Sequence, residues 1–162
     1  MFIPNSVLAS KSQRFLNFII DRVFFLFIML FFTLLLSLLA ELTGDYSWIE
    51  WLQHINNLSD ALVSILINLL YYFIFELAFG KTIGKFITGT MVVSKNNDEL
   101  KASQVAYRTL SRIIPFEPFS FFGDVPVGWH DSNGNSLVVD VKKYNLEKQM
   151  RDSFKEIGEN LD

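Results

Sequence analysis

Three residues near the N-terminus have the spacing of one helix face. Arg14, Asn17 and Asp21 are separated by three and four residues, so all three project from the same side of a helix. Asp21 lies roughly 10 Å beyond Arg14 at 1.5 Å per residue, and an acid at that depth in a membrane is costly unless it is paired or faces a polar cavity. Two interpretations stay open. In one, Arg14 and Arg22 anchor the helix at the interface with Asp21 as counter-ion; in the other, Asp21 is buried and paired with an arginine.

A second polar row recurs every four residues further along the chain, at Asp60, Ser64, Asn68, Tyr72 and Glu76. Such a row can join two helices by hydrogen bonds, but that role does not explain a carboxylate. Glu76 and Asp21 could instead form a buried ion network or a pair of carboxylates that exchange a proton for a cation. The bases available to them are Arg14, Arg108 and Arg112. The last two share a helix face at a spacing of four, and anionic lipid headgroups are their alternative partners.

The elements that position these residues follow from the composition. The chain has 162 residues, of which 51% are hydrophobic and 19% charged, and Phe occurs 17 times. The apolar residues gather in two runs, which predict transmembrane helices at about 15–40 and 59–79. A cleaved signal peptide is the competing interpretation of the first run, but its apolar core exceeds the usual length of roughly 7–15 residues. The predicted fold is therefore mainly α and integral to a membrane.

The basic residues indicate an orientation. All 14 Lys and Arg residues precede Val23 or follow Gly80. The connection between the spans contains acidic residues but no Lys or Arg. By the positive-inside rule, both termini are cytoplasmic and residues 41–58 form an external loop. The prediction is a multi-pass membrane protein.

The composition changes after the second span, where residues 80–141 form a predicted cytoplasmic region. Thr88–Ser94 and Ser136–Val141 have strand character and could pair as a two-stranded ribbon, and Ser103 could cap a helix that runs to Ile114. The proline-broken stretch Pro115–Phe122 is too short to span, so it is expected to be re-entrant or to lie at the interface. Residues 142–162 predict an amphipathic helix, because the apolar residues Leu146, Met150, Phe154, Ile157 and Leu161 follow helical spacing.

Several kinds of site are excluded by composition. The chain has no Cys and two His residues, so disulfides, thiolate metal sites and His-rich metal clusters are impossible. A net charge of −3 argues against a nucleic-acid partner. His130-Asp131 lacks the further histidines that a metal-dependent hydrolase needs. No catalytic constellation remains, so neither an enzyme nor a cofactor is expected.

One glycine motif imitates a phosphate-binding loop. Gly80 and Gly84 are separated by three residues rather than four, and Phe86 occupies the position of the Ser or Thr that would hold magnesium. Gly80 is better explained as a helix C-cap, with Lys81 and Lys85 at the lipid headgroups.

Over residues 1–141 the chain resembles the RDD family of small membrane proteins. The resemblance rests on Arg14 seven residues before Asp21, on GKTIGKFITGTMVV at 80–93, on the pair Arg108 and Arg112, and on GWHD at 128–131. The arginine and two aspartates of the family name would be Arg14, Asp21 and Asp131. The segments IPFEPFSFF and GWHD resemble the sequences of family members from Bacteroidetes-type bacteria. A third hydrophobic segment, frequent in the family, is reduced here to Pro115–Phe122.

The resemblance implies a membrane location, transport of an unidentified ligand and, for some members, sodium/proton antiport. Two hypotheses follow for a chain with only two spans. In the first it is a transport component, and protomers assemble so that Asp21, Glu76 and the arginines line a shared path. In the second it is a non-transporting accessory or assembly subunit that docks a larger membrane protein. The expected partners are the lipid bilayer and either a second copy or another membrane protein.

Overall fold

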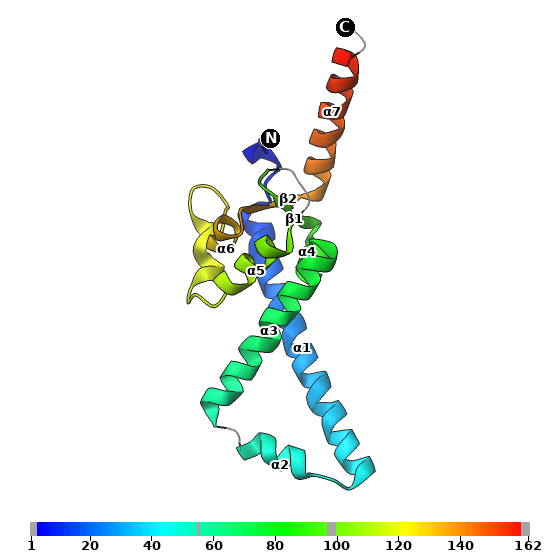
Figure 1. The fold of residues 1–162 in the computed structure, drawn as a ribbon, viewed down its shortest axis with the longest axis vertical. Helices are drawn as coiled ribbons and strands as arrows, with labels where there is room; N and C mark the ends of the chain where they lie inside the picture. Colours follow the sequence, from blue (N-terminus) through cyan, green and yellow to red (C-terminus); the bar gives the residue numbers. More distant parts are fainter. Residues whose placement is uncertain (1–2, 55, 97–99, 160–162) are drawn as a thin grey trace.

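Two long helices dominate the computed structural model, which describes residues 3–54, 56–96 and 100–159. Helix α1 (Lys11–Thr43) and helix α3 (Asn57–Phe79) are joined by the short helix α2 (Ser47–His54). The two long helices cross near the middle of the molecule and diverge toward α2 (Figure 1). Both are long and apolar enough to cross a membrane, and only 11% and 17% of their most apolar windows are buried. Both predicted spans are therefore present as helices.

Local capping explains where these helices begin and end. The Ser10 hydroxyl accepts from the Gln13 N–H while the Gln13 side chain accepts from the Ser10 N–H, which satisfies donors that the first turn of α1 leaves free. The Asn56 side chain caps α3 by accepting a hydrogen bond from the Ser59 N–H. The helices end at Gly44 (φ 70°) and Gly80 (φ 62°), where glycine adopts the left-handed conformation at little cost. The predicted C-cap at Gly80 is confirmed.

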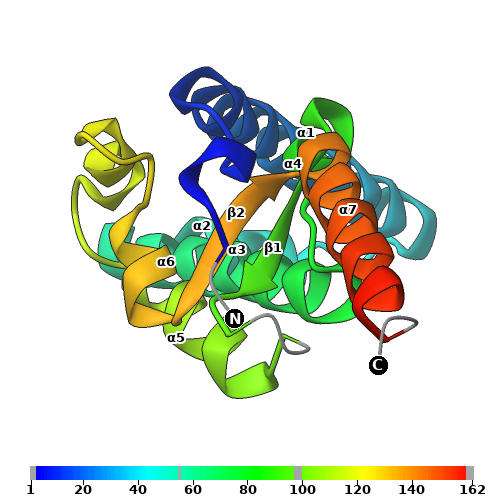
Figure 2. The same cartoon turned by 90° about the horizontal axis from the view of Figure 1, so that it is seen from above.

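A small antiparallel sheet lies at the end of the molecule opposite α2. Strand β1 (Thr90–Ser94) pairs with strand β2 (Ser136–Asp140) in the register Thr90 to Asp140. The N-terminal segment with the 3-10 helix η1 (Asn5–Val7) runs along β2 (Figure 2), where the Ala9 N–H donates to the Val138 carbonyl. A hydrophobic core is formed here by Ile3, Val7, Leu8, Val93, Leu137 and Val139.

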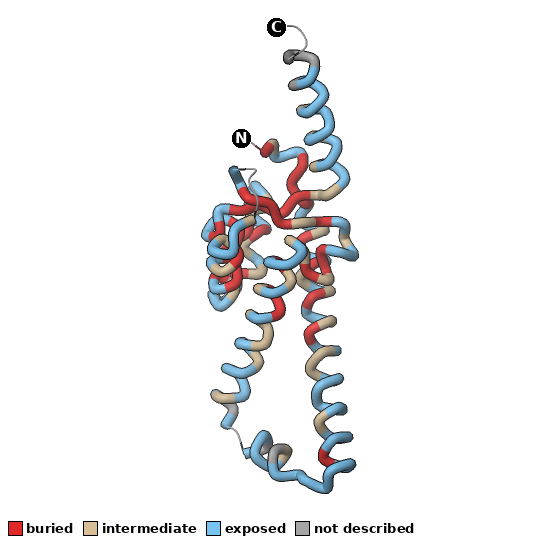
Figure 3. The backbone as a smooth tube through the Cα atoms, turned by 45° about the vertical axis from the view of Figure 1, so that its right-hand side comes forward, coloured by how far each residue is buried: buried red, intermediate tan, exposed pale blue. Residues whose placement is uncertain are grey.

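Four short elements fill the space between the sheet and the long helices: α4 (Ile83–Thr88), α5 (Ala102–Ser111), the 3-10 helix η2 (Glu117–Phe122) and α6 (Trp129–Asn133). Helix α4 packs on α1, α5 packs on α3 and α6, and η2 packs on α1 and α6. Buried residues concentrate in this region, whereas the outer parts of the long helices are exposed (Figure 3).

The last helix, α7 (Val141–Glu159), follows β2 directly and projects away from the sheet (Figure 1). Its apolar residues Leu146, Met150 and Phe154 are exposed. The side chain of Ile157 and all of Leu161, the other members of the predicted apolar stripe, lie outside the described residues. Within the described part, α7 therefore presents an apolar row without a covering element.

Two local predictions need correction, and the structure also places the stretch after Pro115. Helix α5 begins at Ala102 with Lys101 as N-cap, because the Gln104 side chain accepts from the Lys101 N–H, so Ser103 is not the cap. Thr88 belongs to α4 rather than to the strand. The stretch after Pro115 folds into η2 against the first turns of α1, where its Phe119 and Phe122 rings lie 6.2 and 6.3 Å from Phe18 and Phe15 of α1.

Candidate functional site

Arg108 joins two groups of buried charges. Its side chain is completely buried on α5, which packs between α3 and α6. The guanidinium Nε lies 2.9 Å from Glu76 Oε2 of α3, and Nη1 lies 2.6 Å from Asp131 Oδ1 of α6. Burial alone would lower the pKa of Arg108, but Glu76 and Asp131 outweigh it and raise that pKa. One residue thus connects a candidate membrane span to the folded region beside it.

Glu76 is surrounded by three cations. Besides Arg108, its Oε1 accepts from Lys85 Nζ at 2.9 Å and from Arg112 Nη2 at 2.8 Å. The Arg112 guanidinium also lies 4.0 Å over the ring of Tyr72, one helical turn before Glu76. A fully buried carboxylate requires such pairing, since an unpaired ion loses its hydration without compensation. Burial lowers the pKa of Lys85, although the charge of Glu76 acts in the opposite direction.

Asp131 anchors the second group. Its Oδ2 lies 2.6 Å from Arg14 Nη1 and accepts the Gly128 N–H at 2.9 Å. His130 lies beside it, with Nε2 3.2 Å from Asp131 Oδ1 and Nδ1 in hydrogen-bond contact with Glu117 of η2. Burial would raise the pKa of Asp131, but the charges of His130, Arg14 and Arg108 hold it well below its usual range.

Asp21 has neutral partners. Its Oδ1 accepts from the Tyr71 hydroxyl at 2.8 Å and from the Gly84 N–H at 2.8 Å, and its Oδ2 accepts from the Thr82 hydroxyl at 2.7 Å. Asp21 is 2% exposed, so the expected burial is present, but the expected pairing with an arginine is wrong. Arg14 lies about two turns away on α1 and contacts Asp131 instead.

Asn17 lies between these two residues at the place where α1 and α4 approach most closely. Its side-chain amide bonds the hydroxyls of Thr88 and Thr90. A Cβ built on Gly84 would lie 2.5 Å from the Asn17 carbonyl oxygen and 3.0 Å from the Asn17 Cα. Only glycine at position 84 permits this contact, and it brings the Gly84 N–H to Asp21.

We expect Gly84→Ala to separate α4 from α1 and to lower the free energy of unfolding by about 1–3 kcal/mol, the usual cost of overpacking. The measurement is thermal unfolding of the purified chain in detergent. Gly123→Ala is the matched control, because a Cβ there meets nothing within 4 Å and the backbone φ is −59°. Equal melting temperatures for the two variants would contradict the predicted contact.

Sequence reasoning assigned Lys85 to the lipid headgroups, and this is wrong. Lys85 is 4% exposed and pairs with Glu76, because α4 turns back from the end of α3 and directs the lysine inward. Lys81, by contrast, is partly exposed over the ring of Phe86. Other buried members of the site were also missed, namely Tyr71, Thr82, Glu117 and His130. The GKTIGK motif that begins at Gly80 contains both Lys85 and Thr82, but the motif does not show that Thr82 contacts Asp21, 61 residues earlier, or that Lys85 turns back to Glu76.

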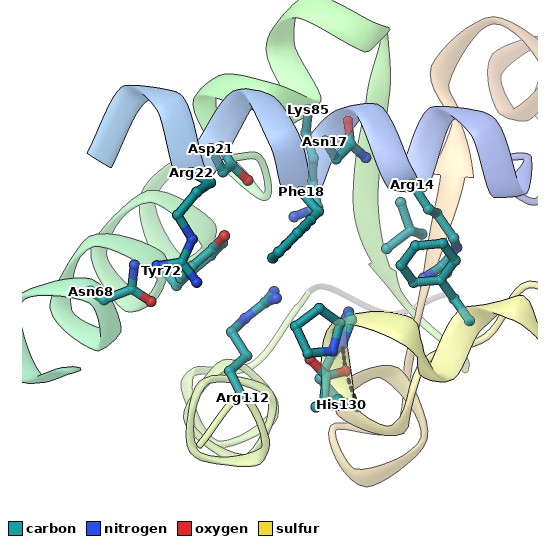
Figure 4. Close-up of a pocket in the computed structure, with 14 residues that line it drawn as sticks. Arg14, Asn17, Phe18, Asp21, Arg22, Asn68, Tyr72, Lys85, Arg112 and His130 are labelled. Carbon is teal, nitrogen blue, oxygen red and sulfur yellow. Dashed lines mark hydrogen bonds and ion pairs between the residues drawn. The ribbon is translucent and has the colours of Figure 1, made fainter. Parts of the chain in front are cut away.

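A polar cavity of about 80 Å³ lies between α1, α3, α5 and η2 (Figure 4). Its walls include Asp21, Arg22, Asn68, Tyr72 and Arg112, together with Arg14, Asn17, Lys85, Glu117 and His130. Nε and Nη2 of Arg14 and Nε of Arg112 are buried without a hydrogen-bond partner in the described part of the chain. The cavity therefore has unsatisfied donors in its walls.

The site brings together all seven residues singled out from the sequence. Arg14, Arg108, Arg112, Glu76 and Asp131 form one ion network, while Asp21 and Asn17 are held beside it on α1 by hydroxyl and amide groups. Over the described residues, no three His, Asp or Glu side chains are arranged to hold a metal ion. The chemistry available here is the binding of charged or polar groups and the holding of protons.

Comparison with known proteins gives one informative result. Neither the curated proteins nor the solved structures include a significant match to this chain. The family model described as RDD family matches residues 8–133, a range that contains every charged residue of the network described above. Together with the two apolar helices, this match indicates a membrane protein. Since the matched range covers most of the sequence, the chain belongs to the RDD family.

Proposed function

We propose that the protein is a transport component for a small ion or ligand, that it acts as an oligomer in the bacterial inner membrane, and that both termini are cytoplasmic. The observation that carries this proposal is the charged cavity between α1 and α3, because buried ionisable groups at a candidate span are expensive and mark ligand paths by default. Three buried nitrogens of the arginines in the cavity wall, Nε and Nη2 of Arg14 and Nε of Arg112, have no partner in the described chain and are available to a ligand.

Oligomer formation is part of the proposal because two helices cannot enclose a path across the bilayer. Both long helices diverge away from the cavity and leave most of their apolar surface uncovered (Figure 3). In a transport component, copies of the chain would pack these surfaces together. The polar row on α3 would then continue the path outward from Tyr72 through Asn68 and Ser64.

The contacts revise which carboxylate could couple transport to protons. Lys85, Arg108 and Arg112 pair with the two carboxylate oxygens of Glu76, so a metal cation at Glu76 would meet three positive charges. Asp21 lies at the cavity wall and makes no ion pair with any described residue. In the proton-coupled cation version of the proposal, Asp21 is the exchanging group.

Reconstituted liposomes test this version. The purified chain, with a pH-sensitive dye inside the vesicles, is expected to show sodium-dependent proton flux that Asp21→Asn abolishes. Asp60→Asn is the control, because Asp60 is an exposed acid at the opposite end of α3. Absence of flux with sodium, potassium and lithium for correctly folded protein would refute cation antiport.

The orientation can be tested separately, because the chain contains no cysteine. Lys148→Cys on α7 and Asp45→Cys before α2 are both exposed positions at opposite ends of the molecule. An impermeant thiol reagent applied to intact cells is expected to label Asp45→Cys alone, as the positive-inside rule requires. Labelling of Lys148→Cys alone would reverse the proposed orientation.

The alternative is a non-transporting accessory or assembly subunit. It is favoured by the exposed apolar row Leu146, Met150 and Phe154 on α7, which no described element covers and which offers a contact surface outside the cavity. The mass of the complex purified in mild detergent separates the two functions. A homo-oligomer supports the transport component, and a stoichiometric foreign subunit supports the accessory role.

A further inference from the structure

We infer that the cavity between α1, α3 and α5 binds a phosphate-type oxyanion, with Arg14, Arg22 and Arg112 as its donors. The inference concerns the chemistry of the ligand and goes beyond the proposed transport function, since binding requires neither movement across the membrane nor assembly of protomers. It rests on the unmet hydrogen bonds of the cavity, on its charge and on the placement of Arg22 and Arg112 across the cavity from each other.

The unsatisfied groups of the cavity are all donors. Arg14 is 4% exposed, and two of its three guanidinium nitrogens, Nε and Nη2, are buried without a partner in the described part of the chain. Nε of Arg112 is in the same state. The acids at the cavity, by contrast, are engaged: Asp21 accepts three hydrogen bonds, and Glu117 contacts His130. A ligand that completes the site must therefore supply acceptor oxygens.

Arg22 adds a charge that nothing in the described chain neutralises. It makes no hydrogen bond or ion pair with a described residue, and its nearest recorded contact is the ring of Phe18 at 5.8 Å. Five basic residues stand against four acids in the network and cavity, which leaves a net charge of +1 before His130 is counted: Arg14, Arg22, Lys85, Arg108 and Arg112 against Asp21, Glu76, Glu117 and Asp131. Arg22 is exposed, so water can hydrate it, and its charge favours an anion over a cation at the mouth of the cavity.

The geometry brings two of the donors together. Arg22 of α1 and Arg112, the C-cap of α5, point toward each other across the cavity, with Tyr72 and Asn68 of α3 on one side and Arg14 at the other end (Figure 4). Arg22 and Arg112 carry like charges, which repel each other. No described carboxylate pairs with Arg22 to offset that repulsion. A cavity of about 80 Å³ is several times the roughly 10–15 Å³ needed for one water, so it has room for a small polyatomic anion. Guanidinium forks match the oxygens of phosphate in paired hydrogen bonds.

Two sources could supply this phosphate group. Arg22 lies near the end of α1 from which the apolar run begins, where the headgroup of an anionic phospholipid would be within reach. Free inorganic phosphate could enter the same cavity from the aqueous side. The chemistry at the arginines is the same in both cases, so the experiment uses a probe for each source.

Thermal unfolding of the full chain in a neutral detergent measures the binding. Sodium phosphate is titrated against sodium chloride of equal ionic strength, and phosphatidylglycerol is titrated against phosphatidylcholine. Wild-type protein is expected to be stabilised by phosphate, by phosphatidylglycerol or by both. Arg22→Gln is expected to raise the apparent dissociation constant of the stabilising probe by about tenfold or more, which is the effect of losing one charged hydrogen bond. Lys81→Gln, which removes a positive charge outside the cavity, should respond as wild type does.

Arg22→Gln is the decisive variant because Arg22 has no ion pair to lose, so its unliganded melting temperature should be no lower than that of wild type. A response to phosphate assigns the site to an aqueous oxyanion, and a response to phosphatidylglycerol alone assigns it to a lipid headgroup. Failure of both probes to stabilise wild type, or an equal response of wild type and Arg22→Gln, would overturn the inference. Neither result depends on the flux measured in liposomes.

Discussion

Replacement of Arg108 by glutamine is expected to lower the free energy of unfolding by about 3–5 kcal/mol, the usual cost of removing one partner from a buried ion pair. The side chain is 0% exposed and contacts both Glu76 and Asp131, so its loss reduces the neutralisation of two buried carboxylates at once. Glutamine offers one amide in place of three guanidinium nitrogens and carries no charge. The measurement is thermal or denaturant unfolding of the purified chain in detergent.

Arg151→Gln on α7 is the matched control. Arg151 and Glu147 form an exposed-helix pair with 3.9 Å between Nε and Oε1, and such pairs contribute about 0–1 kcal/mol. Lowered stability for Arg108→Gln with little change for Arg151→Gln would show that α3, α5 and α6 are joined through Arg108. Similar small effects for both variants would mean that water or another base satisfies Glu76 and Asp131.

Asp131→Asn is expected to have an effect of similar size at neutral pH, about 3–5 kcal/mol, because Arg14 and Arg108 both lose a charged partner. Arg14 would then keep no acidic partner among the described residues, although it is almost completely buried. Asp152→Asn on the exposed side of α7 is the control, and its melting temperature should remain that of wild type.

The pH dependence of the same variant provides a second readout. The pKa of Asp131 in the folded protein lies well below its ordinary value of 3.8, because His130, Arg14 and Arg108 outweigh the effect of burial. The stability that Asp131 contributes is therefore present above pH 3.8 and is lost as the pH falls through the lowered pKa. Wild-type protein should lose stability on acidification, and Asp131→Asn should lose less over the same range. Parallel pH profiles for the two proteins would show that Asp131 is not paired in the folded state.

Local features of this protein were determined by the sequence alone. Two long, mainly apolar runs predicted α1 and α3, since a helix satisfies its own backbone in lipid. Gly80 predicted the end of α3, because glycine adopts positive φ without steric cost. The strand-forming residues at 88–94 and 136–141 predicted both strands to within two residues. The spacing of Arg14, Asn17 and Asp21 correctly placed all three on one buried face of α1.

Only the tertiary structure decided which charges meet. Asp21 bonds Tyr71, Thr82 and Gly84, whereas Arg14 reaches Asp131, which lies 117 residues later in the chain. Helical spacing fixes the side of a helix from which a residue projects, but it does not fix which other element covers that side. That choice follows from the close contact of α4 with α1 at Gly84 and from the packing of α5 between α3 and α6. For the same reason, Lys85 points inward to Glu76 instead of outward to lipid. Packing of α1, α3 and α5 likewise leaves a cavity whose walls contain arginine nitrogens without a partner in the described chain.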